Sequence, residues 1–263
     1  MTMQPRFSIQ VATVISLYLT VVAAPMTAID CADWNSQEFF ETATAADVAD
    51  CIRTGADLKA QNEMGNTPLH SAATSNDGPA VIAVLVDAGA DLKARDKNGL
   101  TPLHSAAFGN ENPAVITALV DAGADLKARA MLGMTPLHHA AMANENPAVI
   151  TVLVDAGADL DAREMMLGTT PLHHAAGHNE HPAVITALAD AGADLAARDK
   201  FGKTPLHWAA EKNENPAVIA MLLDTGADLR ALDRFGKTPW DYVKDREALK
   251  DSDAHRRLDE NRF

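Results

Sequence analysis

The sequence predicts an all-α solenoid of short helix-turn-helix repeats, and three observations lead to this fold class. The motif Thr-Pro-Leu-His recurs at intervals of 34 or 35 residues, and its copies begin at Thr67, Thr101, Thr135, Thr170 and Thr204. A second motif, Pro-Ala-Val-Ile, recurs once in each interval, and aromatic residues make up only 5% of the chain. A fixed period of this length indicates a repeat array in which each unit packs only against its neighbours.

The net charge of the chain excludes some classes of binding partner. The formal net charge is -14, and no block of Lys or Arg stands out. Nucleic acid and anionic membrane surfaces attract basic proteins, so both are poor candidate partners. The acidic balance instead favours a protein partner with basic patches.

Residues 1–28 have the layout of a secretory signal peptide. Arg6 is the only charged residue before Asp30, and 7–24 is largely apolar. The small residues at which cleavage is expected are Ala23, Ala24 and Ala28. An uncleaved anchor is the alternative, because an apolar stretch of this length just spans a bilayer. We expect export, to the periplasm or to the extracellular space, with no membrane association after cleavage.

Two cysteines, Cys31 and Cys51, follow the leader. In an oxidising compartment two nearby cysteines generally form a disulfide, and closing a loop of this size stabilises a fold by roughly 3 kcal/mol. Two unrelated buried thiols are the alternative. A disulfide here would hold together the first unit of the array, which has a neighbour on one face only.

The first unit, 29–66, is predicted to be an N-terminal capping repeat. Asn35 or Ser36 can cap a first helix, and Thr44 with Asp47 resembles a capping box at the start of a second helix. Gly55 would end that second helix. The unit lacks the Thr-Pro-Leu-His motif, which is consistent with a terminal position.

Five full repeats fill 67–237 and share one pattern. In the second of them Thr101 can cap a short helix that begins with Pro102. Asn112 then caps a second helix beginning with Pro113, and Gly123 ends it in a left-handed conformation. The segment 238–263 departs from this pattern, because Trp240 and Asp241 replace Leu and His and many charges follow. It is therefore predicted to be a C-terminal capping repeat.

These motifs resemble the ankyrin repeat, whose units carry Thr-Pro-Leu-His-x-Ala-Ala, a second helix and then Gly-Ala-Asp-Leu. The resemblance runs from about Trp34 to the C-terminus and implies an α-solenoid with short extended loop tips. The period differs from the family's usual 33 residues, and we place the extra residue in the loop between the two helices. The loop of the fourth unit, from Glu164 to Gly168, is one residue longer again.

No catalytic or cofactor site emerges from the sequence. The resemblance implies that the histidine of each Thr-Pro-Leu-His orders its turn by hydrogen bonds beside Thr. Four further histidines, His139, His174, His178 and His181, leave a zinc- or copper-binding protein as an alternative, with the nearby methionines as helpers. A stabilising companion of a neighbouring enzyme is a second alternative. We expect a monomer that is not an enzyme and binds no cofactor.

The positions that vary between copies point to partner binding. In ankyrin-like folds the residue after the signature histidine faces a groove, and here that column reads Ser71, Ser105, His139, His174, Trp208 and Tyr242. Large aromatic residues are favoured interface anchors. The predicted loop tips and the residues near them add an adaptable apolar surface at Met131, Leu132, Met134, Met142, Met165, Met166 and Leu167. The alternative is that these side chains fold back onto adjacent loops.

Overall fold

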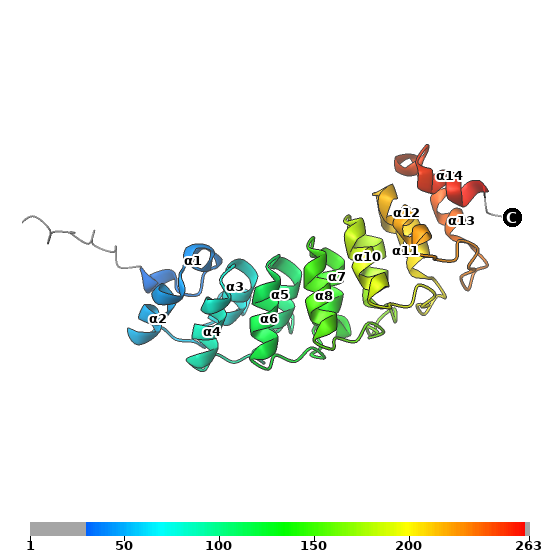
Figure 1. Ribbon diagram of the computed structural model, residues 1–263. Helices are drawn as coiled ribbons and strands as arrows, with labels where there is room; N and C mark the ends of the chain where they lie inside the picture. The colour runs from blue at the N-terminus through cyan, green and yellow to red at the C-terminus, as the bar shows by residue number, and fades with distance from the viewer. Residues whose placement is uncertain (1–29, 261–263) are drawn as a thin grey trace, which may run out of the picture. The chain divides into compact units, whose positions relative to one another are not determined.

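The computed structural model describes residues 30–260. The unit from Cys31 onward is a row of paired helices, and its described part contains no strand (Figure 1). The first helices of the pairs are α1 (Gln37–Thr42), α3 (Pro68–Ser75), α5 (Pro102–Gly109), α7 (Pro136–Ala143), α9 (Pro171–His178), α11 (Pro205–Lys212) and α13 (Pro239–Val243). The second helices are α2 (Ala45–Arg53), α4 (Pro79–Asp87), α6 (Pro113–Asp121), α8 (Pro147–Asp155), α10 (Pro182–Asp190), α12 (Pro216–Asp224) and α14 (Asp253–Glu260). Three short 3-10 helices complete the set, η1 (Cys31–Asp33), η2 (Met131–Gly133) and η3 (Glu247–Leu249).

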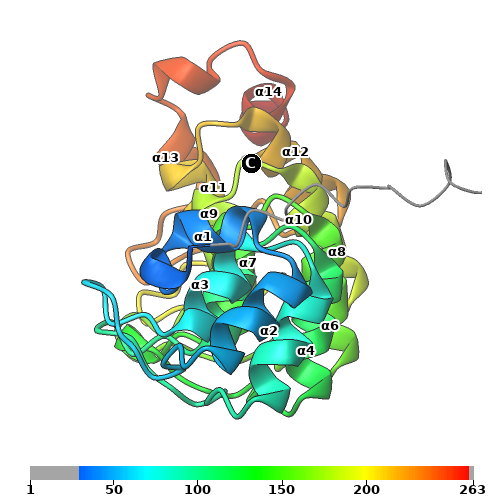
Figure 2. The same cartoon turned by 90° about the vertical axis from the view of Figure 1, so that its left-hand side faces the viewer.

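The helices form two layers. Each first helix packs against the first helices of the neighbouring units, and each second helix packs against the neighbouring second helices. Viewed along the row, the long loops that join successive pairs project together to one side (Figure 2). The predicted all-α solenoid of helix-turn-helix repeats is confirmed.

The second helices supply the apolar core because their Val, Ile and Leu side chains share one face. In α8, the side chains of Val149, Ile150 and Leu153 are fully buried. Burying an aliphatic side chain of this size contributes about 1.5–3 kcal/mol. Gly157, just after the helix, adopts a φ of 98°, which a residue with a side chain adopts only at a cost. The loop can therefore leave the helix sharply.

The signature histidines join neighbouring units. The ring Nδ1 of His138 accepts a hydrogen bond from the backbone N–H of Thr135 at 3.2 Å and lies 2.8 Å from the Thr135 hydroxyl. The proton therefore resides on Nε2, which donates to the Thr169 carbonyl of the next unit at 3.2 Å. The same arrangement recurs in the other copies, at His70, His104, His173 and His207. These rings are structural, as the resemblance implied.

An asparagine ladder explains how the array accommodates its longer period. Asn110 is buried between units, and its side-chain Nδ2 donates to the carbonyls of Ala73 and Asn76 in the preceding unit. Its Oδ1 accepts from the backbone N–H of Asn112, two residues later. Equivalent bonds are made by Asn76, Asn144, Asn179 and Asn213. This ladder fixes the loop between the two helices, in which the extra residue is predicted to lie.

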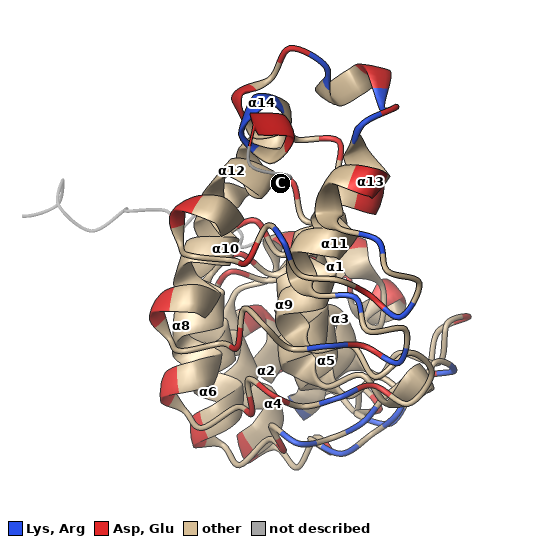
Figure 3. Cartoon of the chain, turned by 90° about the vertical axis from the view of Figure 1, so that its right-hand side faces the viewer, with Lys and Arg blue, Asp and Glu red and all other residues tan. Residues whose placement is uncertain are grey.

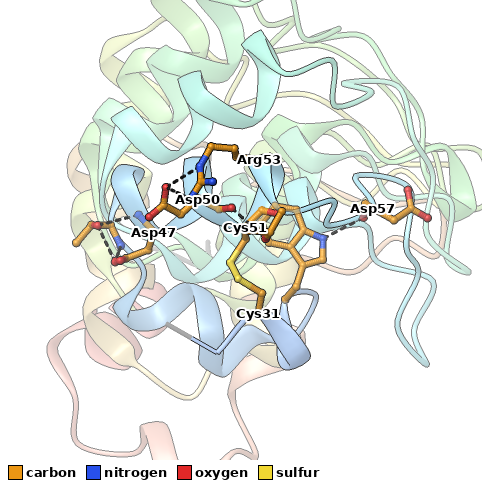
Figure 4. Close-up of a disulfide and its surroundings, with 9 residues drawn as sticks. Cys31, Asp47, Asp50, Cys51, Arg53 and Asp57 are labelled. Carbon is orange, nitrogen blue, oxygen red and sulfur yellow. Dashed lines mark hydrogen bonds and ion pairs between the residues drawn. A yellow bond between two sulfur atoms is a disulfide. The ribbon is translucent and has the colours of Figure 1, made fainter. Parts of the chain in front are cut away.

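The first unit is held by a disulfide and an aromatic cluster. Cys31 and Cys51 are joined with 5.7 Å between their Cα atoms, which ties η1 to α2 (Figure 4). Trp34 packs against Phe39 and Phe40, with ring centroids 5.9 and 5.8 Å away, and its indole N–H donates to the Asp57 carbonyl. Ser36 caps α1, and Thr44 with Asp47 forms the predicted capping box of α2. The first unit therefore has its own small core.

The last unit closes the array with a charged helix. Trp240 of α13 packs on His255 of α14, with ring centroids 4.8 Å apart, and Leu258 is fully buried against the array. Arg246 donates to the Ala210 carbonyl at 2.9 Å, in the place that asparagine occupies in earlier units. The predicted leader, 1–28, lies outside the described residues. No helix in the described part has both the length and the apolar character needed to cross a bilayer.

Candidate interaction surface

The loop tips of successive units form one continuous edge. The backbone N–H of Met131 donates to the Asn98 carbonyl of the preceding tip, and that of Met165 donates to Leu132 at 2.7 Å. Three further tip-to-tip bonds of this kind are Lys97 to Met64, Lys200 to Leu167 and Arg234 to Phe201. Because each tip is bonded to the next, the edge presents its side chains in a fixed order.

In most of the tips, an acidic or amide side chain accepts hydrogen bonds from the backbone of its own tip. Asp199 accepts hydrogen bonds from the backbone N–H groups of Phe201 and Lys203, and Asp233 does the same for its own tip. Burial by itself raises the pKa of Asp233, but bonds from Tyr242 and the tip backbone outweigh burial, so the pKa lies below its ordinary value. These buried carboxylates stabilise the turn, and the outward-pointing side chains of the tip are exposed to solvent.

The fourth tip carries the one-residue insertion, and a longer acid accommodates it. Glu164 replaces the usual Asp, and its carboxylate accepts from the backbone N–H groups of Met166, Leu167 and Thr169. Burial raises the pKa of Glu164, yet these bonds lower it more, so it titrates below its ordinary range. The extra methylene reaches across the enlarged loop.

The third tip has no such acid. Ala130 stands where the other units carry Asp, Asn or Glu, and the tip forms the 3-10 turn η2 instead. Leu132 there adopts a φ of 63°, in the left-handed region that favours glycine. Holding a leucine in this conformation costs roughly 1–2 kcal/mol. The side chain of Leu132 is exposed as a result of this turn.

Exposed apolar side chains line this edge from the third tip onward. Met165, Met166 and Phe235 expose 67%, 56% and 67% of their surface. We define the apolar ridge as Met131, Leu132, Met165, Met166, Leu167, Phe201 and Phe235. The rings of Phe201 and Phe235 stack with centroids 6.4 Å apart, which makes the ridge continuous between the last two tips. Five ridge residues were predicted from the sequence, with Leu167 half-buried, and polar Asn98 ends the ridge toward the N-terminus.

The two phenylalanines of the ridge were not predicted. The signal was present, because Lys-Phe-Gly at Phe201 and Arg-Phe-Gly at Phe235 occupy the tip position where Met and Leu stand in earlier units.

Trp208 is not an exposed anchor, contrary to the sequence-based prediction. The side chain is only 4% exposed, and its indole N–H donates to the Asp199 carboxylate at 3.0 Å. The Lys212 ammonium lies 3.8 Å from the ring centroid and covers the remaining face. Gly177 leaves room for the ring, since a side chain there would meet the indole at 2.9 Å. Trp208 therefore packs within the array.

Tyr242 is half-buried and also engaged within the chain. Its hydroxyl donates to the Asp233 carboxylate at 2.5 Å, and burial together with this bond raises its pKa above the ordinary value. The ammonium groups of Lys203 and Lys237 lie 4.4 and 5.1 Å from its ring centroid. These cations and the carboxylate occupy the polar and π faces that a partner would otherwise use.

Two of the predicted methionines also depart from the surface. Met134 is 7% exposed, so it cannot contact a partner directly. Met142, near the end of α7, is half-buried. Of the predicted methionines, the exposed ones therefore all lie at the tips.

His139 and His174 are half-buried and lack part of their hydrogen bonding. Neither ring nitrogen of His139 has a partner in the described residues, and its ring packs edge-on against His104 at 5.4 Å. His174 packs the same way on His138, and its Nε2 lies 3.0 Å from the Thr169 hydroxyl while Nδ1 is unpartnered. Burial lowers the pKa of His139 to about 4 and that of His174 to about 3. Both rings are neutral at pH 7.

The extra histidines do not converge on a metal site. His178 stacks on His174 at 6.0 Å, whereas His181 pairs with Glu145 at 3.4 Å, a contact between the ends of two units. In residues 30–260, no group of three or more His, Cys, Asp or Glu side chains is placed to hold a metal ion. Nothing in the geometry favours the metal-binding alternative.

Charge is segregated between the two edges of the array. The second helices α4, α6, α8, α10 and α12 contain no Lys or Arg and each ends in Asp. The Lys and Arg residues of the same units lie mainly along the loops, where Figure 3 shows blue segments interspersed with red ones. Despite the net charge of -14, the exposed charges at the outermost residues of the last four tips are mostly cations, and the predicted preference for a basic partner is not supported there.

Comparison with known proteins agrees with this architecture. A family model for ankyrin repeats (3 copies) matches residues 42–130, 80–164 and 111–199, and a model for the single ankyrin repeat matches 201–234. The chain belongs to the ankyrin repeat family. A similar solved structure is the ankyrin repeat domain of Bcl-3, described as a unique member of the IkappaB protein family. This ankyrin array is 30% identical to it with a TM-score of 0.63, over 79% of this chain and 92% of that chain. No curated protein matches significantly.

Proposed function

We propose that this ankyrin array is a non-enzymatic scaffold that binds a partner protein along its apolar ridge. Ankyrin repeats typically serve as protein-interaction modules, and the exposed ridge is the observation that carries the proposal for this chain. Contiguous exposed apolar patches of this kind usually mark interaction sites. The predicted groove anchors Trp208 and Tyr242 are secondary, because their polar groups are already bonded within the chain.

The geometry also supports rigid-surface recognition. Tip-to-tip backbone bonds hold the ridge in place before a partner arrives, which limits the conformational entropy lost on binding. Met131, Met165 and Met166 add side chains that adapt to an irregular partner surface. A fixed backbone with flexible apolar ends suits one partner held with little rearrangement of the scaffold.

Affinity capture tests this proposal. We expect the full chain to retain a specific partner from the cell that exports it, and Met166→Ser with Phe201→Ser to lower the captured amount at least tenfold. Met64→Ser is the matched control, because Met64 is also an exposed tip residue but lies beyond polar Asn98. Equal capture by all three proteins would contradict a role for the ridge.

We further propose that the protein acts after export, with the periplasm as the first expectation and the extracellular space as the second. The Cys31–Cys51 disulfide supports this location, because such bonds persist mainly in oxidising compartments. N-terminal sequencing of the protein from fractionated cells tests it. Expected is a mature start after Ala23, Ala24 or Ala28, whereas an intact Met1 in the cytoplasmic fraction would contradict export.

A further inference from the structure

The tips that carry the apolar ridge also carry most of the cations of their units. Seven Lys and Arg residues occupy the last four tips, and they are Arg129, Arg163, Arg198, Lys200, Lys203, Arg234 and Lys237. All are exposed except Lys203, which is half-buried. The acids of the same four tips, Glu164, Asp199 and Asp233, are at most 7% exposed and turned into their own loops. Exposed acids of the same loops, such as Asp161 and Asp194, lie closer in sequence to the second helices, so solvent at the outermost residues meets mainly cations beside apolar side chains.

Carboxylates offset few of these positive charges, because most hydrogen-bond partners of the seven side chains are neutral carbonyls. Arg129 donates to the carbonyls of Gly133 and Arg163 at 2.7 and 2.9 Å, and Arg163 and Arg198 repeat the pattern one unit on. The Lys200 ammonium donates to the carbonyls of Met165 and Met166. Among the ion pairs of residues 30–260, only Lys203 with Glu211 involves one of the seven. Carbonyl dipoles orient a cation but leave its net charge in place.

The second helices, on the side away from the tips, disfavour an anionic ligand. The second helices α4, α6, α8, α10 and α12 end in Asp and contain no Lys or Arg, so an anionic ligand is disfavoured there and directed toward the tips. Electrostatic complementarity of this kind fixes orientation and accelerates encounter. This distribution of charge favours binding at the tips and favours a ligand that is negatively charged.

We propose that the ridge recognises an extended acidic segment of a partner protein, with apolar side chains at about every third position and Asp and Glu between them. This inference rests on the proposed function and adds the chemistry of the partner. Neighbouring units lie about 8–10 Å apart when helices pack normally, and a chain extended in the polyproline II conformation has three residues per turn and rises about 3.1 Å per residue. One apolar residue in about every three would therefore meet one tip after another, with carboxylates between them facing the cations.

Selection from a display library of random 16-residue peptides tests the inference on the full, disulfide-bonded chain. Expected is enrichment of peptides more acidic than the starting library, with apolar residues at about every third position. Lys200→Glu with Arg234→Glu should lower their enrichment at least tenfold. Lys59→Glu with Lys93→Glu is the matched control, because it changes the net charge equally but lies before the first two tips, and it should retain enrichment.

Different failures of this experiment have different meanings. Enrichment of basic or uncharged peptides, or of acidic peptides that bind the Lys200 and Arg234 variant equally, would overturn the inference and leave the proposed function standing. Absence of any enrichment above the bare support would overturn both. Circular dichroism confirms folding, and Lys200→Gln with Arg234→Gln serves if the Glu pair unfolds, with an expected loss of at least threefold.

An anionic membrane is the alternative surface for a basic, apolar edge. Sedimentation with vesicles of phosphatidylcholine and phosphatidylglycerol distinguishes it. No sedimentation above the level seen with phosphatidylcholine alone is expected. Sedimentation that depends on phosphatidylglycerol and is lost with Lys200→Glu and Arg234→Glu would overturn a protein partner.

Discussion

The middle units and the last two units of the array place a ring at the same position of the first helix, but they treat its polar atoms differently. Trp208 and Tyr242 each donate to an aspartate nine residues earlier, Asp199 and Asp233. His139 has Ala130 nine residues earlier, and both its nitrogens remain without a partner. In these three units, an aspartate at the tip satisfies the ring, and alanine at that position leaves the ring unsatisfied.

The comparison teaches how to interpret a variable column in a repeat protein. An aromatic residue that differs from its counterparts indicates a binding anchor only if the chain itself does not use its polar atoms and faces. In the last two units, the tip aspartate and nearby lysines already contact the polar atoms and ring faces of Trp208 and Tyr242. The apolar surface that stays exposed there lies at the tips. In the middle units the unpartnered imidazoles make the core sensitive to acid.

The largest expected effect is acid destabilisation of the middle units. Burial lowers the pKa of four middle histidines, His104, His138, His139 and His173, to about 4, and that of His174 to about 3. The unfolded chain binds protons near pH 6.5 and the folded chain does not, so stability is complete above 6.5 and falls as the pH drops toward 4. Between pH 7 and 5 we expect a loss of about 1–2 kcal/mol per histidine.

Hydrogen exchange at pH 7 and pH 5 checks this prediction. Protection should fall first in α7 and α9, and later in α11 and α12. His139→Phe removes one of the titrating rings and should lessen the dependence on pH. Equal loss of protection along the array would contradict a special role for the middle units.

A smaller effect is expected when the tip acid of a satisfied unit is removed. Asp199→Ala leaves the Trp208 indole N–H and two tip N–H groups without their acceptor, and should lower the free energy of unfolding by about 3 kcal/mol. Urea denaturation measures it. Asp228→Ala, which removes an exposed loop acid that accepts one backbone bond, should cost less than 1 kcal/mol. Similar costs for the two variants would show that the indole bond contributes little.

The smallest expected effect is a gain in stability when the third tip is given the carboxylate that it lacks. Ala130→Asp places a carboxylate where the last two units have one, and should raise the free energy of unfolding by about 1 kcal/mol through bonds to the tip backbone and to His139. The pKa of His139 should rise, because a nearby carboxylate stabilises the imidazolium form. Titration of the His139 ring by NMR follows this shift. An unchanged pKa would mean that the two side chains do not meet.

The fold follows almost entirely from the sequence because each helix boundary has a local cause. Thr before Pro, Asn before Pro and Gly after the second helix act within a few residues, so their pattern predicts the helix pairs. The asparagine ladder was not predicted, because the acceptors of Asn110 belong to residues 34 and 37 positions earlier. Its recurrence was visible, but its partners require the packed units.

The binding surface was only partly predictable, for two physical reasons. Total charge gives no information on where charges lie, so the exposed cations of the tips were hidden by acids on the second helices and in the loops. Burial of Trp208 depends on room provided by Gly177 in the preceding unit, which residue identity alone does not reveal. The methionine tips were found because an apolar residue in a polar turn is unusual in itself.

Methionine oxidation footprinting tests most directly the claim that partners bind along the tips. The measurement compares sulfoxide formation in the free chain and in its complex with the most enriched acidic peptide. The account predicts that Met131, Met165 and Met166 oxidise in the free chain and are protected in the complex, while exposed Met64 oxidises equally in both. Equal oxidation of Met165 and Met166 with and without the bound peptide would contradict it.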